Sequence, residues 1–210
     1  RTGLLPRIKM LGPTLGLPIE HIQYANGHPH VNLLKLLAKT HVPLRDYQQE
    51  AVDQVLPHDM GVVYIATGGG KTHIAAAIIA RRAIPTIFLV HTKELLWQTK
   101  ERFEELLKVK IGVIGDGIFE PEDITVATVQ TLSNQPLGRK VGMVIQDETH
   151  HIPADTFYYV TSKFDAKYVY GLSATPYRKD GADLMIEAAA GPIVVQVTPS
   201  DLIERKWLAQ

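Results

Sequence analysis

The chain has 210 residues, of which 45% are hydrophobic and 21% charged, a composition that is typical of a folded globular protein and excludes a disordered chain. Its 22 basic and 22 acidic residues balance to zero net charge, and the lack of cysteine excludes disulfides and cysteine-ligated metals. No apolar run approaches the roughly 18 residues of a membrane span and no signal peptide is visible, so we expect an intracellular protein of the cytoplasm or nucleoid.

The first 40 residues differ from the rest in charge. Residues 1–45 contain six Lys or Arg and a single acid, Glu20, so a neutral total leaves room for a basic face. Glycine and proline interrupt residues 12–18, whereas residues 31–39 have the spacing of a short amphipathic helix. We predict a small N-terminal appendage, or the end of an accessory DNA-binding domain, over 1–40 and the main domain over 41–210.

The main domain is predicted to begin with a helix over 44–55, which packs by Leu44 and Tyr47. Arg45 and Gln48 are expected on its polar side. Two interpretations stay open for them: simple solvent exposure, or contact with an adenine base. Their position just upstream of a glycine-rich loop favours the second.

That loop lies between an apolar run predicted as a strand, 62–65, and an alanine-rich run predicted as a buried helix, 74–80. Glycines let the backbone approach a ligand, and the start of a helix attracts anions. A lysine and a hydroxyl at the helix start are the residues that reach the phosphates and Mg²⁺ of a bound nucleotide. The pattern predicts a phosphate loop made of Thr67, Gly68, Gly69, Gly70, Lys71 and Thr72.

Further strands are predicted at 86–90, 124–127, 141–145, 168–172 and 193–197, and the segment 112–117 is interpreted as a turn-rich link. Thr92 is a candidate N-cap for a helix that runs to Leu107. Strands separated by helix-length segments predict an α/β fold with a mainly parallel sheet flanked by helices. Ligands of such sheets bind at the carboxyl ends of the strands.

Two acids, Asp147 and Glu148, follow the strand predicted at 141–145. Paired with a phosphate loop, Asp147 is a candidate Mg²⁺ ligand and Glu148 a candidate general base for the attacking water. His150, next to this pair, is expected to hydrogen-bond beside the γ-phosphate. Ser173 and Thr175, after the next strand, are candidates for coupling nucleotide state to another surface.

Together these residues resemble the first RecA-like motor domain of superfamily 2 helicases. The blocks that carry the resemblance are 66–72, 91–95, 147–150 and 173–175, and the Asp-Glu-x-His form and the Leu-Arg-x-Tyr-Gln start are similar to the XPB branch and its phage UvsW-type relatives. The resemblance implies a P-loop NTPase fold, ATP with Mg²⁺ as cofactor, and adenine contacts by Arg45 and Gln48.

The resemblance also implies DNA as partner, held through its backbone and not through its sequence. The residues it assigns to nucleic acid are Thr92, Lys93, Thr128, Gln130, Thr131 and Arg178. An unwinding triplet Arg-Glu-Asp of this branch appears here as Arg-Lys-Asp over 178–180, a change of charge.

The resemblance implies the ATPase half of a DNA helicase or translocase that acts in repair, recombination or replication-fork remodelling. The second RecA-like domain, with its arginines, is expected to be absent from these 210 residues, so we predict weak ATP binding and poor hydrolysis by this chain alone. Three alternatives stay open: the motor subunit of a restriction system, an RNA helicase, and a nucleic-acid-binding module without turnover.

Overall fold

The structure is a computed structural model that describes residues 31–38, 40–134, 141–147, 154–164, 166–175, 187 and 190–208. The described strands form one sheet of eight, in the order β4-β3-β5-β2-β6-β7-β1-β8. All neighbouring strands pair in parallel except β3 and β4. The strands are β1 (Met60–Ile65), β2 (Thr86–Val90), β3 (Gly112–Gly115), β4 (Ile118–Glu120), β5 (Ile124–Thr128), β6 (Met143–Gln146), β7 (Tyr168–Ser173) and β8 (Ile193–Val197).

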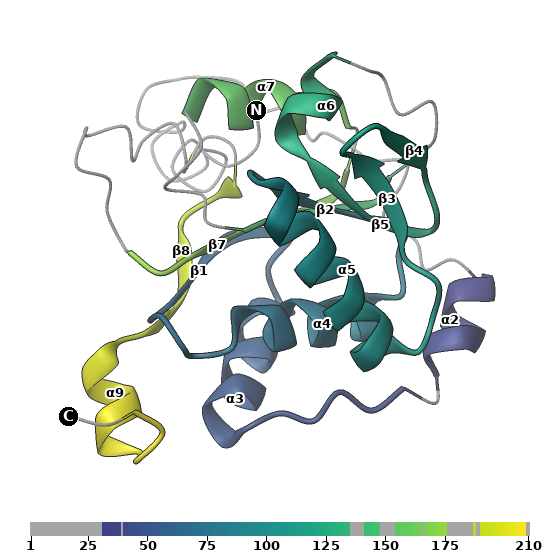
Figure 1. Ribbon diagram of the computed structural model, residues 1–210. Helices are drawn as coiled ribbons and strands as arrows, with labels where there is room; N and C mark the ends of the chain where they lie inside the picture. Colours follow the sequence, from purple (N-terminus) through teal and green to yellow (C-terminus); the bar gives the residue numbers. More distant parts are fainter. Residues whose placement is uncertain are drawn as a thin grey trace, which may run out of the picture.

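Helices cover both faces of the sheet, as Figure 1 shows, with α3, α4 and α5 on one side and α6 and α7 on the other. The helices are α2 (Val31–Leu37), α3 (Asp46–Val55), α4 (Lys71–Arg82), α5 (Lys93–Leu107), α6 (Val129–Asn134), α7 (Ala154–Ser162) and α9 (Pro199–Glu204). This is the predicted α/β architecture with a mainly parallel sheet.

The core lies in two layers because successive side chains of a strand point to opposite faces. In β2, Phe88 belongs to the apolar cluster beneath α3, α4 and α5, while Ile87 and Leu89 belong to the cluster on the other face. Both kinds of position are buried, which explains why the central strands are apolar throughout. The ring of Phe103 on α5 meets Phe88 edge-on at 4.9 Å between centroids, so α5 is seated directly on β2.

The helix ends follow the predicted local signals. The Thr92 hydroxyl accepts a hydrogen bond from the Leu95 amide at 3.2 Å, which confirms Thr92 as the N-cap of α5.

Residues 31–38 pack against the main domain, with Leu33 and Leu37 buried in its core. The remainder of the predicted appendage, 1–30 and residue 39, lies outside the described residues, and the boundary at residue 40 stays a prediction.

Three predicted elements need correction. The segment 112–117 is not only a link, because its first four residues form β3, which pairs with β5. A Cβ at Gly112 would collide with the backbone of Glu122, so this glycine permits a close strand contact. The strand predicted from 141 begins at Met143, and the helix predicted from 44 begins at Asp46.

In the part of the chain that the structure describes, no helix combines the length and the apolar character that crossing a bilayer requires.

Candidate functional site

The glycine loop between β1 and α4 has the backbone conformation of an anion cradle. Gly68 and Gly70 have φ values of 81° and 80°, in the left-handed region that only glycine adopts without strain. Gly70 is also the N-cap of α4, and as a glycine it places no side chain over the first turn of the helix. The positive end of this 12-residue helix therefore faces the loop with no side-chain cap, as a bound phosphate requires.

Helix α3 supports the loop from below through one backbone oxygen. The Tyr47 hydroxyl donates to the Gly69 carbonyl at 2.9 Å, and the Gln48 side-chain amide donates to the same oxygen at 3.0 Å. A Cβ on Gly70 would displace this side-chain amide, and the φ of 80° disfavours any other residue there. The conformation of the loop is therefore fixed by residues about 20 positions upstream.

The expectation that Gln48 lies on the solvent side of its helix is wrong. Gln48 is only 4% exposed, and its carboxamide oxygen accepts a hydrogen bond from the Arg45 amide at 2.9 Å. The helical pattern failed because a glutamine that finds hydrogen-bond partners can be buried at low cost. Arg45 is exposed, and its Nη1 donates to the Tyr47 hydroxyl at 3.2 Å. Contact of Arg45 and Gln48 with adenine stays a prediction.

The acidic half of the site lies at the same edge of the sheet. Asp147 follows β6 directly and is 9% exposed, and β6 and β1 are both parallel to β7, which lies between them. Two strand spacings amount to about 10 Å, so the glycine loop and Asp147 leave the sheet on the same side and close together. Glu148 and His150 lie outside the described residues.

The strand between the two halves carries the Ser-Ala-Thr block. Ser173 pairs in register with Tyr64 of β1, and its hydroxyl donates to the Thr175 carbonyl at 2.6 Å. The Ser173 oxygen also accepts from the Thr175 amide at 3.2 Å. This closed turn lies at the carboxyl end of β7, between the loop and Asp147. Its role in coupling stays a prediction.

Thr72 and Asp147 offer the hydroxyl and carboxylate oxygens that Mg²⁺ prefers, and no side chain caps the start of α4, where a phosphate would bind. The donor set therefore fits a magnesium nucleotide. Thr67, in the same loop, is exposed.

A second group of predicted site residues lies at the ends of β2 and β5, which are neighbours in the sheet. Gln130 is exposed at the start of α6, whereas Thr128 is buried and its hydroxyl shares a hydrogen bond of 2.8 Å with that of Thr131. Lys93 is exposed and pairs with Asp116 at 2.6 Å. This hydrogen bond raises the pKa of Lys93 and lowers that of Asp116.

Arg178 lies outside the described residues. The described residues of this group lie along one part of the edge at which the parallel strands end. They are Thr92, Lys93 and the residues at the start of α6. Asp147 and the glycine loop occupy the adjoining part, which starts at β6, the neighbour of β2, and ends at β1.

Three residues near the site were not anticipated in these roles. His73, next to Thr72 on α4, shares a 2.9 Å hydrogen bond with Arg102, and burial, followed by the charges of Arg102 and Arg45, lowers its pKa. Tyr47 was expected to pack only, although a buried tyrosine hydroxyl usually needs a partner, and that signal was available. Trp207 lies beside Arg45, and nothing in the local sequence indicated it.

The known proteins to which this chain is similar are described as restriction enzymes, DNA translocases and helicases. The model of the family described as "Type III restriction enzyme, res subunit" matches residues 41–178. A "DNA 3'-5' translocase XPB2" of Sulfurisphaera tokodaii is 36% identical over 168 residues, which are 79% of this chain and 38% of that protein. A "Putative ATP-dependent RNA helicase L396" of Acanthamoeba polyphaga mimivirus is 33% identical, over 72% of this chain and 31% of that protein.

Among solved structures, the UvsW helicase from bacteriophage T4 superposes with a TM-score of 0.68 at 21% identity, over 91% of this chain and 77% of that one. At this identity the similarity establishes the fold alone, a mainly parallel sheet flanked by helices. Assignment to the helicases comes from the family model and the translocase relative. The chain spans about a third of the length of the curated relatives it matches.

Proposed function

The chain belongs to the family whose model is described as "Type III restriction enzyme, res subunit", and from this membership and its similarity to a DNA translocase we propose that it is the ATP-binding half of a DNA helicase or translocase acting in repair, recombination or replication-fork remodelling. One observation carries the proposal. The glycine loop and Asp147, 75 or more residues apart in sequence, leave the sheet at one edge with a single strand between them. A shared triphosphate fits this separation.

In the proposed reaction, the loop amides and the start of α4 bind the phosphates, and Lys71 neutralises charge on the transferred phosphoryl group. The Thr72 hydroxyl and the Asp147 carboxylate would hold Mg²⁺ bound with the nucleotide, and the ion would add positive charge there. Glu148 takes the proton of the water that attacks the γ-phosphate in line. The polar side chains at the ends of β2 and β5 contact the nucleic-acid backbone, so this binding does not depend on the nucleotide sequence.

Activity of the complete motor needs a second RecA-like domain. An arginine supplied from outside the site typically contributes about 10³–10⁵ in rate in nucleotide hydrolases. We therefore expect the 210-residue chain to bind ATP weakly and to turn it over slowly, with little stimulation by DNA.

The test is nucleotide binding by calorimetry with ATPγS and Mg²⁺, on the wild-type chain and on Lys71→Ala. Loss of binding in Lys71→Ala supports the proposal, and equal binding favours a nucleic-acid-binding module without turnover. Lys110→Ala is the matched control, because Lys110 is an exposed lysine that pairs with Glu122 away from the loop.

Two other motors remain candidates because specific relatives favour them. The family's description favours a restriction motor, which a nuclease domain on the parent polypeptide would establish. The mimivirus relative favours an RNA helicase. Anisotropy of labelled DNA and RNA duplexes of one sequence, each with ATPγS present, separates DNA from RNA.

A further inference from the structure

The end of α9 directs Trp207 toward the nucleotide site. Lys206 has a φ of 61°, its amide donates to the Ile203 carbonyl at 2.9 Å, and the Trp207 amide donates to the Leu202 carbonyl at 2.8 Å. These two bonds form a Schellman motif, which fixes the direction in which a chain leaves its helix. The position of the Trp207 backbone is therefore set by the helix end.

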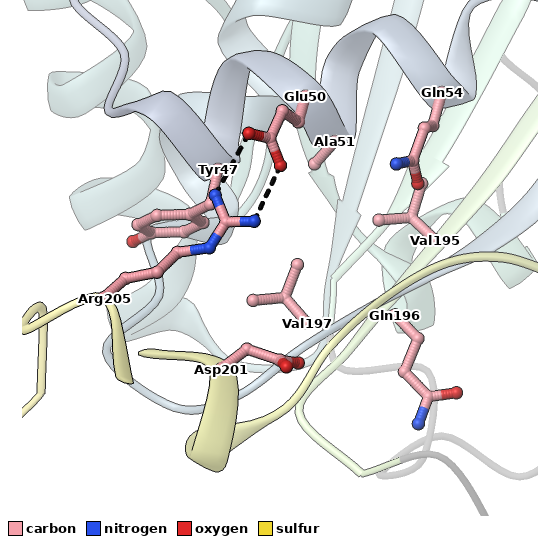
Figure 2. A pocket seen from close by; sticks show the side chains of 9 residues that line it. All are labelled: Tyr47, Glu50, Ala51, Gln54, Val195, Gln196, Val197, Asp201 and Arg205. Atoms are coloured by element: carbon pink, nitrogen blue, oxygen red, sulfur yellow. Dashed lines mark hydrogen bonds and ion pairs between the residues drawn. The ribbon is translucent and has the colours of Figure 1, made fainter. Parts of the chain in front are cut away.

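Helix α9 is in turn fastened to α3. Figure 2 shows Arg205 reaching across to Glu50, with hydrogen bonds of 3.1 and 2.9 Å, above a cavity lined by α3, β8 and α9. This cavity is about 170 Å³, smaller than the roughly 300–1,000 Å³ of sites that enclose small molecules. It separates the two helices without offering a nucleotide site of its own.

Trp207 contacts the first residues of α3. Its indole N–H donates to the Asp46 carboxylate at 3.0 Å, and the Arg45 guanidinium carbon lies 4.5 Å from the centre of its ring. The Arg45 Nη1 also donates to the Tyr47 hydroxyl, which in turn donates to the Gly69 carbonyl of the loop. The guanidinium is therefore held at one edge by Tyr47 and over the Trp207 ring.

The same segment lies beside the loop. The Leu208 side chain lies 3.6 Å from the point where a Cβ on Gly68 would be. Trp207 nevertheless stays 43% exposed and Arg45 is exposed, so the stack is not sealed inside the protein. A planar cation resting on an indole, at the mouth of a phosphate loop, is suited to stack a flat heterocycle on its outer face.

We propose that Trp207 is a positioning residue for the nucleotide base: it supports the Arg45 guanidinium, on which the purine ring of the bound nucleotide stacks. The inference rests on the proposed function, because it needs a nucleotide in the glycine loop. It goes further by assigning the base-dependent part of binding to a stack that joins α3 to the segment after β8. Lys71 and the loop supply the phosphate-dependent part, which is the same with or without a base.

The experiment compares two ligands with Mg²⁺, ATPγS and inorganic tripolyphosphate, by calorimetry on the full 210-residue chain. Trp207→Ala is expected to weaken ATPγS binding about tenfold, since stacking a base on a flat side chain contributes about that much, and to leave tripolyphosphate binding unchanged. Trp207→Phe, which keeps an aromatic plane, is expected to restore most of the ATPγS affinity. Unchanged tripolyphosphate binding also shows that each variant is folded.

A double-mutant cycle tests whether Trp207 acts through Arg45. In an Arg45→Ala background, Trp207→Ala is expected to change ATPγS binding less than twofold, because the supported group is gone. Trp97→Ala is the matched control: Trp97 is a half-buried tryptophan on α5 whose indole N–H also donates to an aspartate, Asp116, at 3.2 Å. It should affect neither ligand.

The outcomes separate the two claims. If wild type binds neither ligand, or if Lys71→Ala weakens neither, the proposed function fails and the inference with it. If Lys71→Ala weakens both but Trp207→Ala changes both ligands equally, changes neither, or adds in full to Arg45→Ala, the inference alone is overturned.

Discussion

The Gly69 carbonyl offers a quantitative test of how α3 holds the phosphate loop. This oxygen is part of a buried residue and accepts from both Tyr47 and Gln48. Tyr47→Phe removes one donor and Gln48→Met removes the other with nearly the same volume. Each single change leaves one donor in place, so the lost bond to Gly69 should cost about 1 kcal/mol of unfolding free energy, the net value of an ordinary hydrogen bond. Gln48→Met also loses the bond from the Arg45 amide, but that loss is the same in the single and the double variant and does not affect their additivity.

The double variant leaves the carbonyl without either donor. A buried acceptor that loses all partners costs a further 1–3 kcal/mol or so, and the pair should therefore destabilise the chain by about 3–5 kcal/mol instead of the additive value of about 2. Urea unfolding followed by circular dichroism measures all four species. Gln49→Met is the control, because Gln49 bonds only at the exposed surface, and we expect a change of at most about 0.5 kcal/mol. Additivity within about 0.5 kcal/mol would refute the shared-acceptor reasoning.

Three further predictions concern charge and burial. Burial, with Arg102 beside it, lowers the pKa of His73 in the folded chain. As the pH drops below about 6.5, the unfolded chain therefore protonates this histidine first, and the free energy of unfolding falls until the pH reaches the lower pKa of the folded chain. In urea titrations, His73→Gln should show a shallower decline of stability over this range. Asp116→Asn should remove the ion-pair partner of Lys93 and let this lysine bind a DNA phosphate. The slope of log affinity against log salt concentration, measured by anisotropy of labelled DNA, should then steepen by up to about one unit. An unchanged slope would mean that Lys93 makes no phosphate contact. Burial raises the pKa of Tyr170 to about 12; stability should therefore decline between pH 10 and 12 in wild type, and less in Tyr170→Phe, as followed by near-ultraviolet absorbance and denaturant midpoints.

The alternation of strands and helices along the chain could be predicted because each central strand is a short apolar run followed by a helix-length segment. Six of the strands, the main helices and the Thr92 cap were confirmed. The pair β3 and β4 was missed because both strands are short, and the turn residues Asp116 and Gly117 between them dominate the local pattern. Pairing of β3 with β5 is a long-range contact that local composition does not encode.

The candidate site was partly predictable for a similar reason. The glycine loop and Asp147 carry their chemistry in local residue types, and parallel strands must end at one edge, so their proximity followed from the fold. The burial of Gln48 did not follow, because its partner is a carbonyl 21 residues later in the chain. Trp207 is farther still, 162 residues from Arg45, and only the packing of α9 on α3 brings the two together.

The sheet also determines how the two parts of the strand-end edge are connected. The Asp147 amide donates to the Leu89 carbonyl at 2.9 Å, so the residue that follows β6 is bonded to β2 three positions before Thr92. Thr92 then fixes the start of α5 through its bond to Leu95. A shift of Asp147 toward a bound nucleotide must stretch this ladder bond or carry the end of β2 with it. Because backbone ladders in a packed sheet deform little, the second result costs less, and the pairing of β2 with β6 mechanically ties the nucleic-acid side of the edge to the nucleotide side.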